Sequence, residues 1–362
     1  MPETNSTYRD RYLAARIAEK IRDISHGMGE LRLMHVCGTH EDAITKAGIR
    51  SLLPKNVEII SGPGCPVCVT TTREIDEALA LAKEGATVTS FGDMLKVPGS
   101  ASSLAEAKAE GSDVRIVYSI TDAVDFAGKN PGKEVVHMGI GFETTAPSTA
   151  IALQDAPDNF FVLSCHRMIP PAMDFLLREG DMRIDGFIDP GHVSAIIGLA
   201  PYRKISREYG IPQVVAGFEP VDVLFAILLL LKMIREEDTG VRNEYSRVVK
   251  EEGNPKALNA LDKVFEKSDL AWRGFPKIPA SGLSLRDEYK KHDARKVFKI
   301  RIKGSKEPEG CLCGKVLKGL IHPKDCPLFG KKCTPEKPVG PCMVSGEGSC
   351  HIAYKYNRIK NA

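Results

Sequence analysis

Short apolar runs, rich in β-branched residues and bounded by turn residues, alternate with segments of helical spacing along most of the chain. Strands that are apolar throughout and separated by helices are typical of parallel sheets covered by helices. The pattern therefore predicts an α/β fold. We expect strands at residues 31–36, 57–60, 87–91, 114–118, 135–138, 160–163, 186–188 and 213–216.

Two further segments have clear apolar patterns. Residues 9–24 have the spacing of a helix, which ends at Gly27 and Gly29. The longest apolar run, 223–231, lies between Asp222 and Lys232 and is too short to cross a bilayer, so we expect a buried helix there.

Turn residues suggest where the chain divides into domains. Residues 128–133 are rich in glycine, lysine and proline and interrupt the strand series near its middle. We expect an N-terminal helix in 1–29 packed on the C-terminal domain, α/β domains at 30–127 and 128–236, and a last domain at 237–362. That last domain begins with charged, helix-prone sequence up to residue 267, followed by irregular sequence at 272–276.

Several polar motifs follow predicted strands directly. In parallel sheets the ligand crevice lies at the carboxyl ends of the strands. We therefore expect Cys37, Cys65, residues 139–145 and residues 189–194 to emerge at one crevice.

Residues 61–72 form a Cys-x-x-Cys loop between a predicted strand and a helix at 73–83, which Thr70, Thr71 or Thr72 can cap. Thiols near a helix N-terminus have lowered pKa values, and a neighbouring pair can form a disulfide that opens and closes. Cys65 and Cys68 therefore carry out thiol redox chemistry or hold a metal. Half of a zinc site is the structural alternative.

Composition and charge narrow the class of protein. The 362 residues are 43% hydrophobic and 27% charged, with a net charge of +3 and ten cysteines. The polar N-terminus has no signal-peptide pattern, so we expect a reducing cytoplasm, where clustered cysteines indicate metal or redox chemistry.

Residues 290–337 are strongly basic, with 14 Lys or Arg against 5 Asp or Glu. Few aromatic residues are interleaved and no groove-reading motif occurs, so nucleic-acid binding is not favoured. The cations offset buried thiolates or meet an acidic protein face, and a solvated surface is the remaining interpretation.

Six cysteines lie near the C-terminus, separated by many glycines and prolines, so loops present their sulfurs. A [4Fe-4S] cluster takes four thiolates and suits loop presentation. Zinc sites also take four, but they usually show paired Cys-x-x-Cys knuckles, which this array lacks. We favour an iron-sulfur cluster, which leaves two thiols over. The six are Cys311, Cys313, Cys326, Cys333, Cys342 and Cys350.

Several long motifs together resemble those of the HypD family of hydrogenase maturation proteins. They are CGTHE at 37–41, GPGCPVCVT at 62–70, GFETTAP at 141–147, PGHVSAIIG at 190–198 and the C-terminal cysteine array. The resemblance implies two α/β domains and a [4Fe-4S] domain, serving as a cytoplasmic scaffold that assembles the Fe(CN)2CO group of [NiFe] hydrogenases. It also implies a small HypC-type partner and a HypE-type cyanide donor. We expect a monomer that contacts neither nucleic acid nor membrane.

The resemblance also implies roles for the cysteines. The family's cluster spacing, C-x14-C-x6-C-x16-C, is met by Cys311, Cys326, Cys333 and Cys350. Cys313 and Cys342 then resemble the redox-active dithiol beside the cluster of ferredoxin:thioredoxin reductases. Cys37 is expected to bind the iron under assembly, with His40 and Glu41 as nearby proton acceptors. Electrons would pass from the cluster through Cys313 and Cys342 to Cys65 and Cys68.

Two further candidate positions have weaker signals. Glu143 follows a glycine-rich turn that could cradle an anion, although it lacks the lysine of a P-loop. His192 stands at a helix start, where it contacts a ligand or caps the helix. Two other functions stay open: a stand-alone iron-sulfur thiol-disulfide reductase, and a zinc-stabilised binding module.

Overall fold

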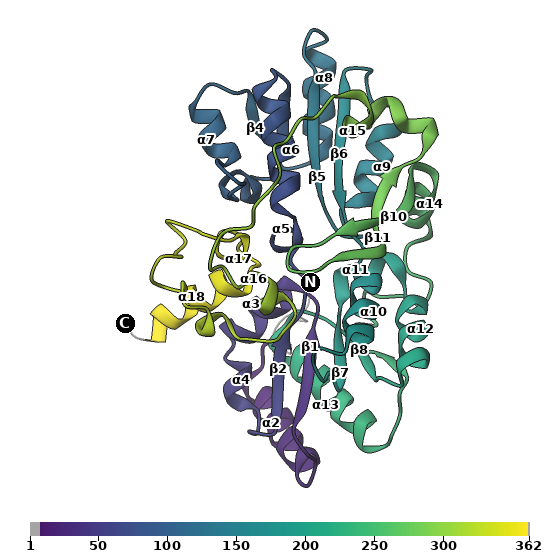
Figure 1. Cartoon of the computed structure of the whole chain (residues 1–362). Helices are drawn as coiled ribbons and strands as arrows, with labels where there is room; N and C mark the ends of the chain where they lie inside the picture. Colours follow the sequence, from purple (N-terminus) through teal and green to yellow (C-terminus); the bar gives the residue numbers. More distant parts are fainter. Residues whose placement is uncertain (1–7, 361–362) are drawn as a thin grey trace.

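The structure, a computed structural model, describes residues 8–360, which form two parallel sheets and a loop-rich C-terminal region (Figure 1). Sheet A has the strand order β2-β1-β7-β8-β9, and sheet B has the order β4-β3-β5-β6. Sheet A consists of β1 (Leu31–His35), β2 (Val57–Ser61), β7 (Gly186–Pro190), β8 (Gln213–Ala216) and β9 (Val241–Asn243). Sheet B consists of β3 (Thr87–Ser90), β4 (Val114–Ile116), β5 (Val135–Gly141) and β6 (Phe160–His166).

Helices connect the strands, as the sequence predicts. Those up to the return into sheet A are α2 (Arg11–Ser25), α3 (Gly38–Lys46), α4 (Ile49–Leu52), α5 (Pro66–Val69), α6 (Thr72–Lys83), η1 (Gly92–Lys96), α7 (Leu104–Ala109), α8 (Ile120–Lys129), α9 (Ala146–Gln154) and α10 (Ile169–Glu179). Those that follow are α11 (Gly191–Ile197), α12 (Ala200–Tyr209), α13 (Pro220–Arg235), α14 (Pro255–Val264), η2 (Asp287–His292), α15 (Ala294–Val297), α16 (Cys313–Leu317), η3 (Pro323–Asp325), α17 (Pro341–Val344) and α18 (Ser349–Lys360).

The predicted α/β fold class is confirmed, and every predicted strand forms within a few residues of its expected bounds. The strands are grouped differently from the expected division at residue 128. After β2 the chain crosses into sheet B, completes it between residues 87 and 166, and returns to sheet A at β7. Residues 128–133 therefore include the end of α8 and part of its connection to β5, inside sheet B. Turn signals are local and do not specify which strands pair.

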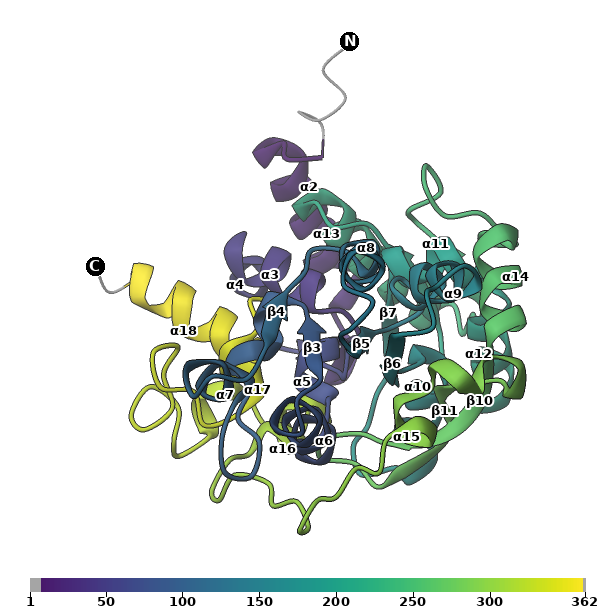
Figure 2. The same cartoon turned by 90° about the horizontal axis from the view of Figure 1, so that it is seen from above.

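The N-terminal helix also lies elsewhere than expected. Helix α2 packs on α13 rather than on the C-terminal region (Figure 2). Its buried residues Ile17 and Ile21 belong to the same core as the apolar face of α13, which gives α2 a larger apolar partner than the glycine-rich cysteine loops offer. The apolar run 223–231 does form a buried helix. Residues 1–7 of the expected N-terminal segment lie outside the described residues.

The region after residue 236 is less helical than expected. It contributes β9 to sheet A and then forms an antiparallel hairpin from β10 (Phe265–Ala271) and β11 (Lys277–Leu285). The irregular residues 272–276 are the turn of this hairpin. No helix among residues 8–360 is long and apolar enough to cross a membrane.

The carboxyl ends of both sheets face the C-terminal region, which lies at the junction between them (Figure 1). Ser345 donates a hydrogen bond to Asp93, which follows β3 of sheet B. Thr39, which follows β1 of sheet A, donates to Glu347. The C-terminal segment therefore contacts both sheets at the carboxyl ends of their strands.

Candidate functional site

Cys37 lies where β1 ends and α3 begins. Its backbone is extended, and the backbone N–H groups of Thr39 and His40 in the first turn of the helix lie close enough to favour the thiolate and lower its pKa. Burial raises the pKa of Cys37 to about 11, more than these donors lower it. The sulfur is therefore a thiol at neutral pH, and a bound cation is needed to displace its proton.

A carboxylate from the C-terminal region faces Cys37. Glu347 accepts a hydrogen bond from the Thr39 hydroxyl at 3.2 Å and packs so closely on Gly38 that a Cβ there would lie 2.6 Å from the Glu347 Cβ. Burial raises the pKa of Glu347, and the negative charge of Glu347 raises the pKa of Cys37. Glu347 was not among the residues predicted from the sequence. Its position inside the GPCMVSGEGSC motif was the available signal.

The Cys-x-x-Cys loop lies directly against the Cys37 backbone. A Cβ on Gly64 would lie 2.1 Å from the backbone nitrogen of Cys37, so only glycine fits there. Gly38 donates its N–H to the carbonyl oxygen of Gly64 at 3.1 Å. Cys65 then caps α5, and its sulfur is joined in a disulfide to buried Cys68. The disulfide-bonded pair Cys65 and Cys68 thus follows Gly64, which touches the Cys37 backbone.

The predicted helix after this loop begins as expected. Thr71 caps α6, and its hydroxyl accepts the N–H of Glu74 while the Glu74 carboxylate accepts the N–H of Thr71. Buried Arg167 donates to the same carboxylate at 2.6 Å. An ion pair from sheet B therefore fixes the helix that follows the redox pair.

The C-terminal cysteines surround one small apolar cavity. All four expected cluster ligands line it together with Cys313, and its other walls are apolar: Leu312, Val316, Leu328, Phe329 and Met343. The backbone N–H of Val339 donates to the sulfur of Cys333 at 3.3 Å. Among the described residues, no three His, Cys, Asp or Glu side chains are arranged to hold a single metal ion. Four thiols around a dry cavity with N–H donors to sulfur fit a [4Fe-4S] cluster, since each iron takes its own thiolate.

The two surplus thiols are neighbours. The thiols of Cys313, Cys342 and Cys350 lie close enough to influence one another, and this proximity lowers the pKa of Cys350 and raises that of Cys342. The sulfurs of Cys311 and Cys313 both lie against Gly340, where a Cβ would come within 2.7 Å of each. Cys342 is fully buried.

The surplus thiols lie on elements that contact the Cys-x-x-Cys helix. Helices α16 and α17, which carry Cys313 and Cys342, both pack against α5. The hairpin turn completes this junction. Arg273 donates its backbone N–H to Val69 and its Nε to Thr70, both at 2.9 Å, while Gly274 touches Gly314 of α16. The structure thereby brings Cys65 and Cys68 to the same junction as the C-terminal array.

His40 and His192 lie on either side of one aromatic ring. The Phe218 ring centroid is 4.8 Å from that of His40 and 4.0 Å from that of His192. Nε2 of buried His40 donates to the Gly217 carbonyl oxygen at 3.0 Å, and its Nδ1 has no partner among the described residues. Burial lowers the pKa of His40 to about 3 and also lowers that of half-buried His192. Both rings are therefore neutral at pH 7, and His192 caps no helix.

The side chain of Glu143 is buried inside the protein, whereas a loop that binds an anion exposes its binding groups. Its carboxylate accepts the N–H of Ile169 at the start of α10, at 3.0 Å, and burial raises its pKa to about 7. A buried carboxylate there repels anions, so the structure does not favour the expected anion cradle. The phenol of buried Tyr202 is close enough to Glu143, Cys37 and Asp189 for their charges to raise its pKa, although burial is the larger cause. Glu143 thus borders the same interior as Cys37.

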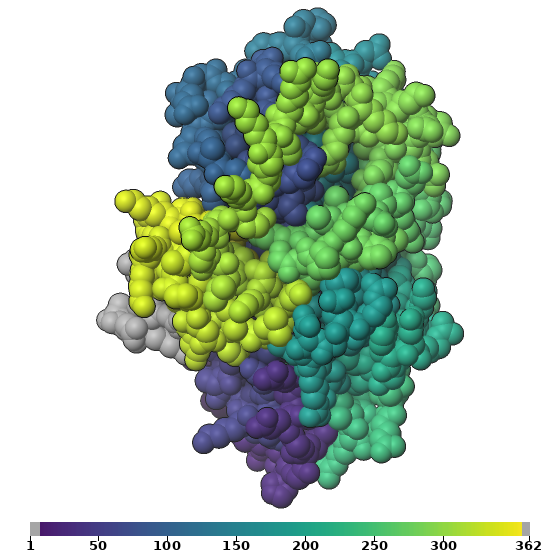
Figure 3. Space-filling view, in the orientation of Figure 1, coloured from purple at the N-terminus to yellow at the C-terminus, as the bar shows by residue number. Residues whose placement is uncertain are grey.

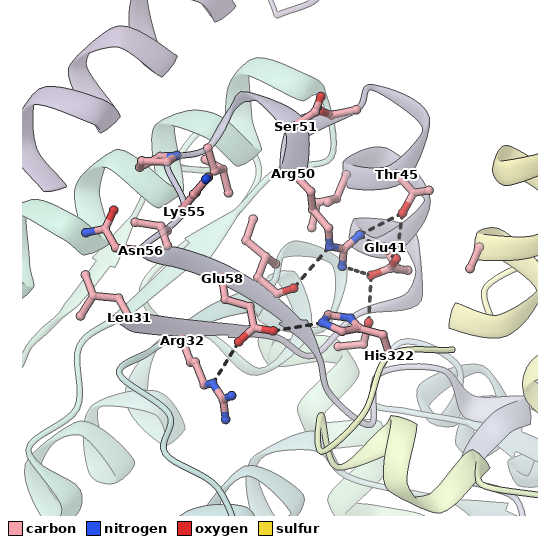
Figure 4. A pocket seen from close by; sticks show the side chains of 18 of the residues that line it. Leu31, Arg32, Glu41, Thr45, Arg50, Ser51, Lys55, Asn56, Glu58 and His322 are labelled. Atoms are coloured by element: carbon pink, nitrogen blue, oxygen red, sulfur yellow. Dashed lines mark hydrogen bonds and ion pairs between the residues drawn. The ribbon is translucent and has the colours of Figure 1, made fainter. Parts of the chain in front are cut away.

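Glu41 does not point at Cys37. Its carboxylate accepts hydrogen bonds from Arg50 and Thr45 (Figure 4). It also accepts hydrogen bonds from Ser61 and from His35, the last at 2.7 Å. Nδ1 of His35 lies 3.0 Å from the carbonyl oxygen of Cys37, so Glu41 supports the backbone of Cys37 through His35. The expected role of Glu41 as a proton acceptor for the Cys37 thiol is therefore not supported. Glu41 also lines a groove of about 650 Å³ beside β2, away from the cysteines.

We expect Glu41→Gln to destabilise the fold by about 3 kcal/mol, because it removes the buried carboxylate charge that pairs with Arg50. Burial raises the pKa of Glu41, but the charge of Arg50 and hydrogen bonds from His35 and Arg50 outweigh it and hold the pKa below its ordinary value. A depressed carboxyl pKa adds stability above about pH 4.3 that is lost as pH falls below it. Urea unfolding at several pH values should show a larger loss for wild type than for the variant, which keeps other carboxyls with lowered pKa values, such as Glu74 and Asp113.

Glu58→Gln is the matched control, because Glu58 pairs with Arg32 and His322 at the exposed rim of the same groove (Figure 4). Its expected cost is below about 1 kcal/mol. If both variants lost the same unfolding free energy, the burial of Glu41 would not increase its contribution to stability.

Comparisons of the sequence with known proteins point to one family. The family described as “HypD: Hydrogenase formation hypA family” matches residues 12–357. A Methanocaldococcus jannaschii protein, whose name describes it as a hydrogenase expression/formation protein, is 51% identical over 97% of this chain and 99% of its own length. The hydrogenase maturation factors HypD of Cupriavidus necator and Rhodobacter capsulatus are 44% and 43% identical, over 98% and 99% of this chain and 97% and 99% of their own lengths.

Proposed function

Because the chain belongs to the HypD family, whose role is hydrogenase maturation, we propose that it is the scaffold on which iron receives cyanide and carbon monoxide. The observation that carries this proposal is the meeting of three thiol sites at one junction: Cys37, the Cys65 and Cys68 pair, and the C-terminal array. We further propose that a small HypC-type partner shares the iron, that a HypE-type protein delivers the cyanide, and that the work takes place in the cytoplasm.

In this proposal, Cys37 binds the incoming iron, which is the substrate of the scaffold. A soft thiolate suits low-spin iron that carries cyanide and carbon monoxide. The thiol proton leaves as iron binds, and Glu347 is the carboxylate placed to take it, because burial raises its pKa toward neutrality. The backbone N–H groups of Thr39 and His40 then stabilise the thiolate. His192, half-exposed beside Phe218, is available to contact ligands of the iron.

Thiol chemistry at Cys65 and Cys68 supplies electrons. Splitting the S–C bond of a thiocyanate into thiolate and cyanide takes up two electrons. Oxidation of the two thiols to a disulfide releases two electrons and two protons, one of which is taken up by the donor's thiolate. The Cys65–Cys68 disulfide is the form in which this step would leave the pair.

The thiols of Cys313 and Cys342, both free in the structure, regenerate the pair by exchange. One of them attacks the disulfide, a mixed disulfide forms, and the second thiol displaces it, so that Cys65 and Cys68 become thiols and the attacking pair becomes a disulfide. Cys311, Cys326, Cys333 and Cys350 would hold a [4Fe-4S] cluster. When bound, such a cluster supplies single electrons.

The test of this function is the iron and acid-labile sulfide content of the protein, purified without oxygen together with its small partner, combined with infrared spectra. About four cluster irons and one more are expected, with bands from metal-bound cyanide and carbon monoxide. Four irons without such bands under any partner condition would instead favour a stand-alone thiol-disulfide reductase. Zinc in place of iron would exclude both functions.

A further inference from the structure

A basic strap, defined as residues 298–308, crosses the surface between α15 and the first cluster cysteine (Figure 3). It has neither helix nor strand, and exposed cations alternate with half-buried Phe298, Ile300 and Ile302. The exposed cations of the strap are Lys299, Arg301, Lys303 and Lys306. Within residues 8–360 none of these four forms an ion pair, whereas several basic side chains just before the strap do.

The strap is held firmly on its inner side. Phe298 meets Phe161 of sheet B edge to face, with ring centroids 4.9 Å apart. Ser305 donates to Asp76 of α6 at 2.6 Å, and the Lys306 N–H donates to the Ser100 hydroxyl at 3.0 Å. The backbone is therefore fixed while the four cations face solvent, an arrangement that repels like charge and attracts an acidic surface.

The strap ends at a pocket of about 380 Å³ that reaches the C-terminal cysteines. Cys311 and Cys313 line it, together with Lys315, Lys318 and Arg273. Arg273 is buried and pairs with the Glu307 carboxylate of the strap, so this ion pair anchors the end of the strap at the pocket. Lys315 is exposed at the pocket and forms no ion pair within residues 8–360, so it extends the positive charge of the strap toward the cysteines.

We propose that the strap and this pocket form the docking site for a small acidic electron-transfer protein. This inference rests on the proposed function, which requires electrons at Cys313 and Cys342. Two molecules of the reduced carrier each lose one electron, and with two protons from solvent the Cys313–Cys342 disulfide becomes two thiols. The carrier's carboxylates meet the strap, which places its redox centre beside the pocket that Cys313 lines.

The test uses a purified acidic ferredoxin as the probe and compares two triple variants. The first is Lys299→Glu with Arg301→Glu and Lys303→Glu. The second, with the same change in net charge, places Lys20→Glu, Lys129→Glu and Lys204→Glu on exposed helix positions without ion pairs. Association is measured at about 0.01 M and about 1 M salt, where the Debye length is about 30 Å and about 3 Å.

We expect wild type to bind the ferredoxin at low salt and to lose binding at high salt. The strap variant should bind at least about tenfold more weakly than wild type at low salt, and the control variant within about twofold. Equal weakening in both variants, or no binding by wild type, would overturn the docking site. So would loss of single-stranded RNA binding in the strap variant, because the strap would then be a nucleic-acid site.

Dithionite, a small reductant that needs no docking surface, separates this inference from the proposed function. If dithionite reduces the Cys65–Cys68 disulfide in anaerobic holoprotein but the ferredoxin does not bind, only the docking site fails. If the ferredoxin binds at the strap but neither reductant opens the disulfide, the proposed electron path fails and the docking site stands.

Discussion

Cys37→Ala is expected to abolish the infrared bands of metal-bound cyanide and carbon monoxide and to remove the one iron beyond the cluster. The reason is that Cys37 is the proposed thiol ligand of that iron, at the N-terminus of α3 and opposite Glu347. The cavity formed by the C-terminal cysteines does not include Cys37, so cluster iron and sulfide should stay at about four each. Infrared spectra and iron analysis of the same anaerobic preparation check both parts.

Cys165→Ala is the matched control for this prediction. Cys165 also lies near the end of a strand and is more deeply buried than Cys37, but its neighbours are Arg295 and Arg167 rather than the junction of the thiol sites. The infrared bands of cyanide and carbon monoxide in Cys165→Ala should be as strong as in wild type for the same amount of folded protein. If Cys37→Ala kept the bands, the iron would be held by other residues and the scaffold proposal would lose its central residue.

Cys68→Ala is expected to leave the cluster and the iron at Cys37 in place but to stop ligand delivery, so that no cyanide or carbon monoxide bands appear. Without Cys68 the pair cannot form its disulfide, and the two electrons that split a thiocyanate are not available. The side chain is small and buried, so its removal should cost only about 1 kcal/mol of stability. Infrared spectra after incubation with the cyanide donor and a reductant check this.

The control for Cys68→Ala is Val67→Ala, which truncates the neighbouring buried side chain of the same short helix and leaves both thiols in place. Its ligand bands should be retained. If Cys68→Ala instead lost the visible absorption of the cluster, the pair would have a structural role, holding α5 against α16 and α17.

Sequence patterns predicted the strands and most helices because those features depend on neighbouring residues. The apolar runs, the threonine cap of α6 and the apolar segment inside α13 all follow from local spacing. The motif resemblance also selected Cys37, the Cys-x-x-Cys pair and the C-terminal array, which the fold brings to one junction. Glu41 was assigned to the correct motif but to the wrong task, because motif position does not show where a side chain points.

The sequence by itself determined the fold class and the family, because these are written in short-range patterns and long motifs. Only the tertiary structure decided that the chain leaves sheet A after β2 and returns at β7, and that Glu347 faces Cys37 across more than 300 positions. It also decided that Glu41 is hydrogen-bonded to His35 and that Arg273 connects the end of α5 to the cysteine array. Those arrangements depend on which apolar faces pack together and which buried charges find partners, and no local pattern encodes either.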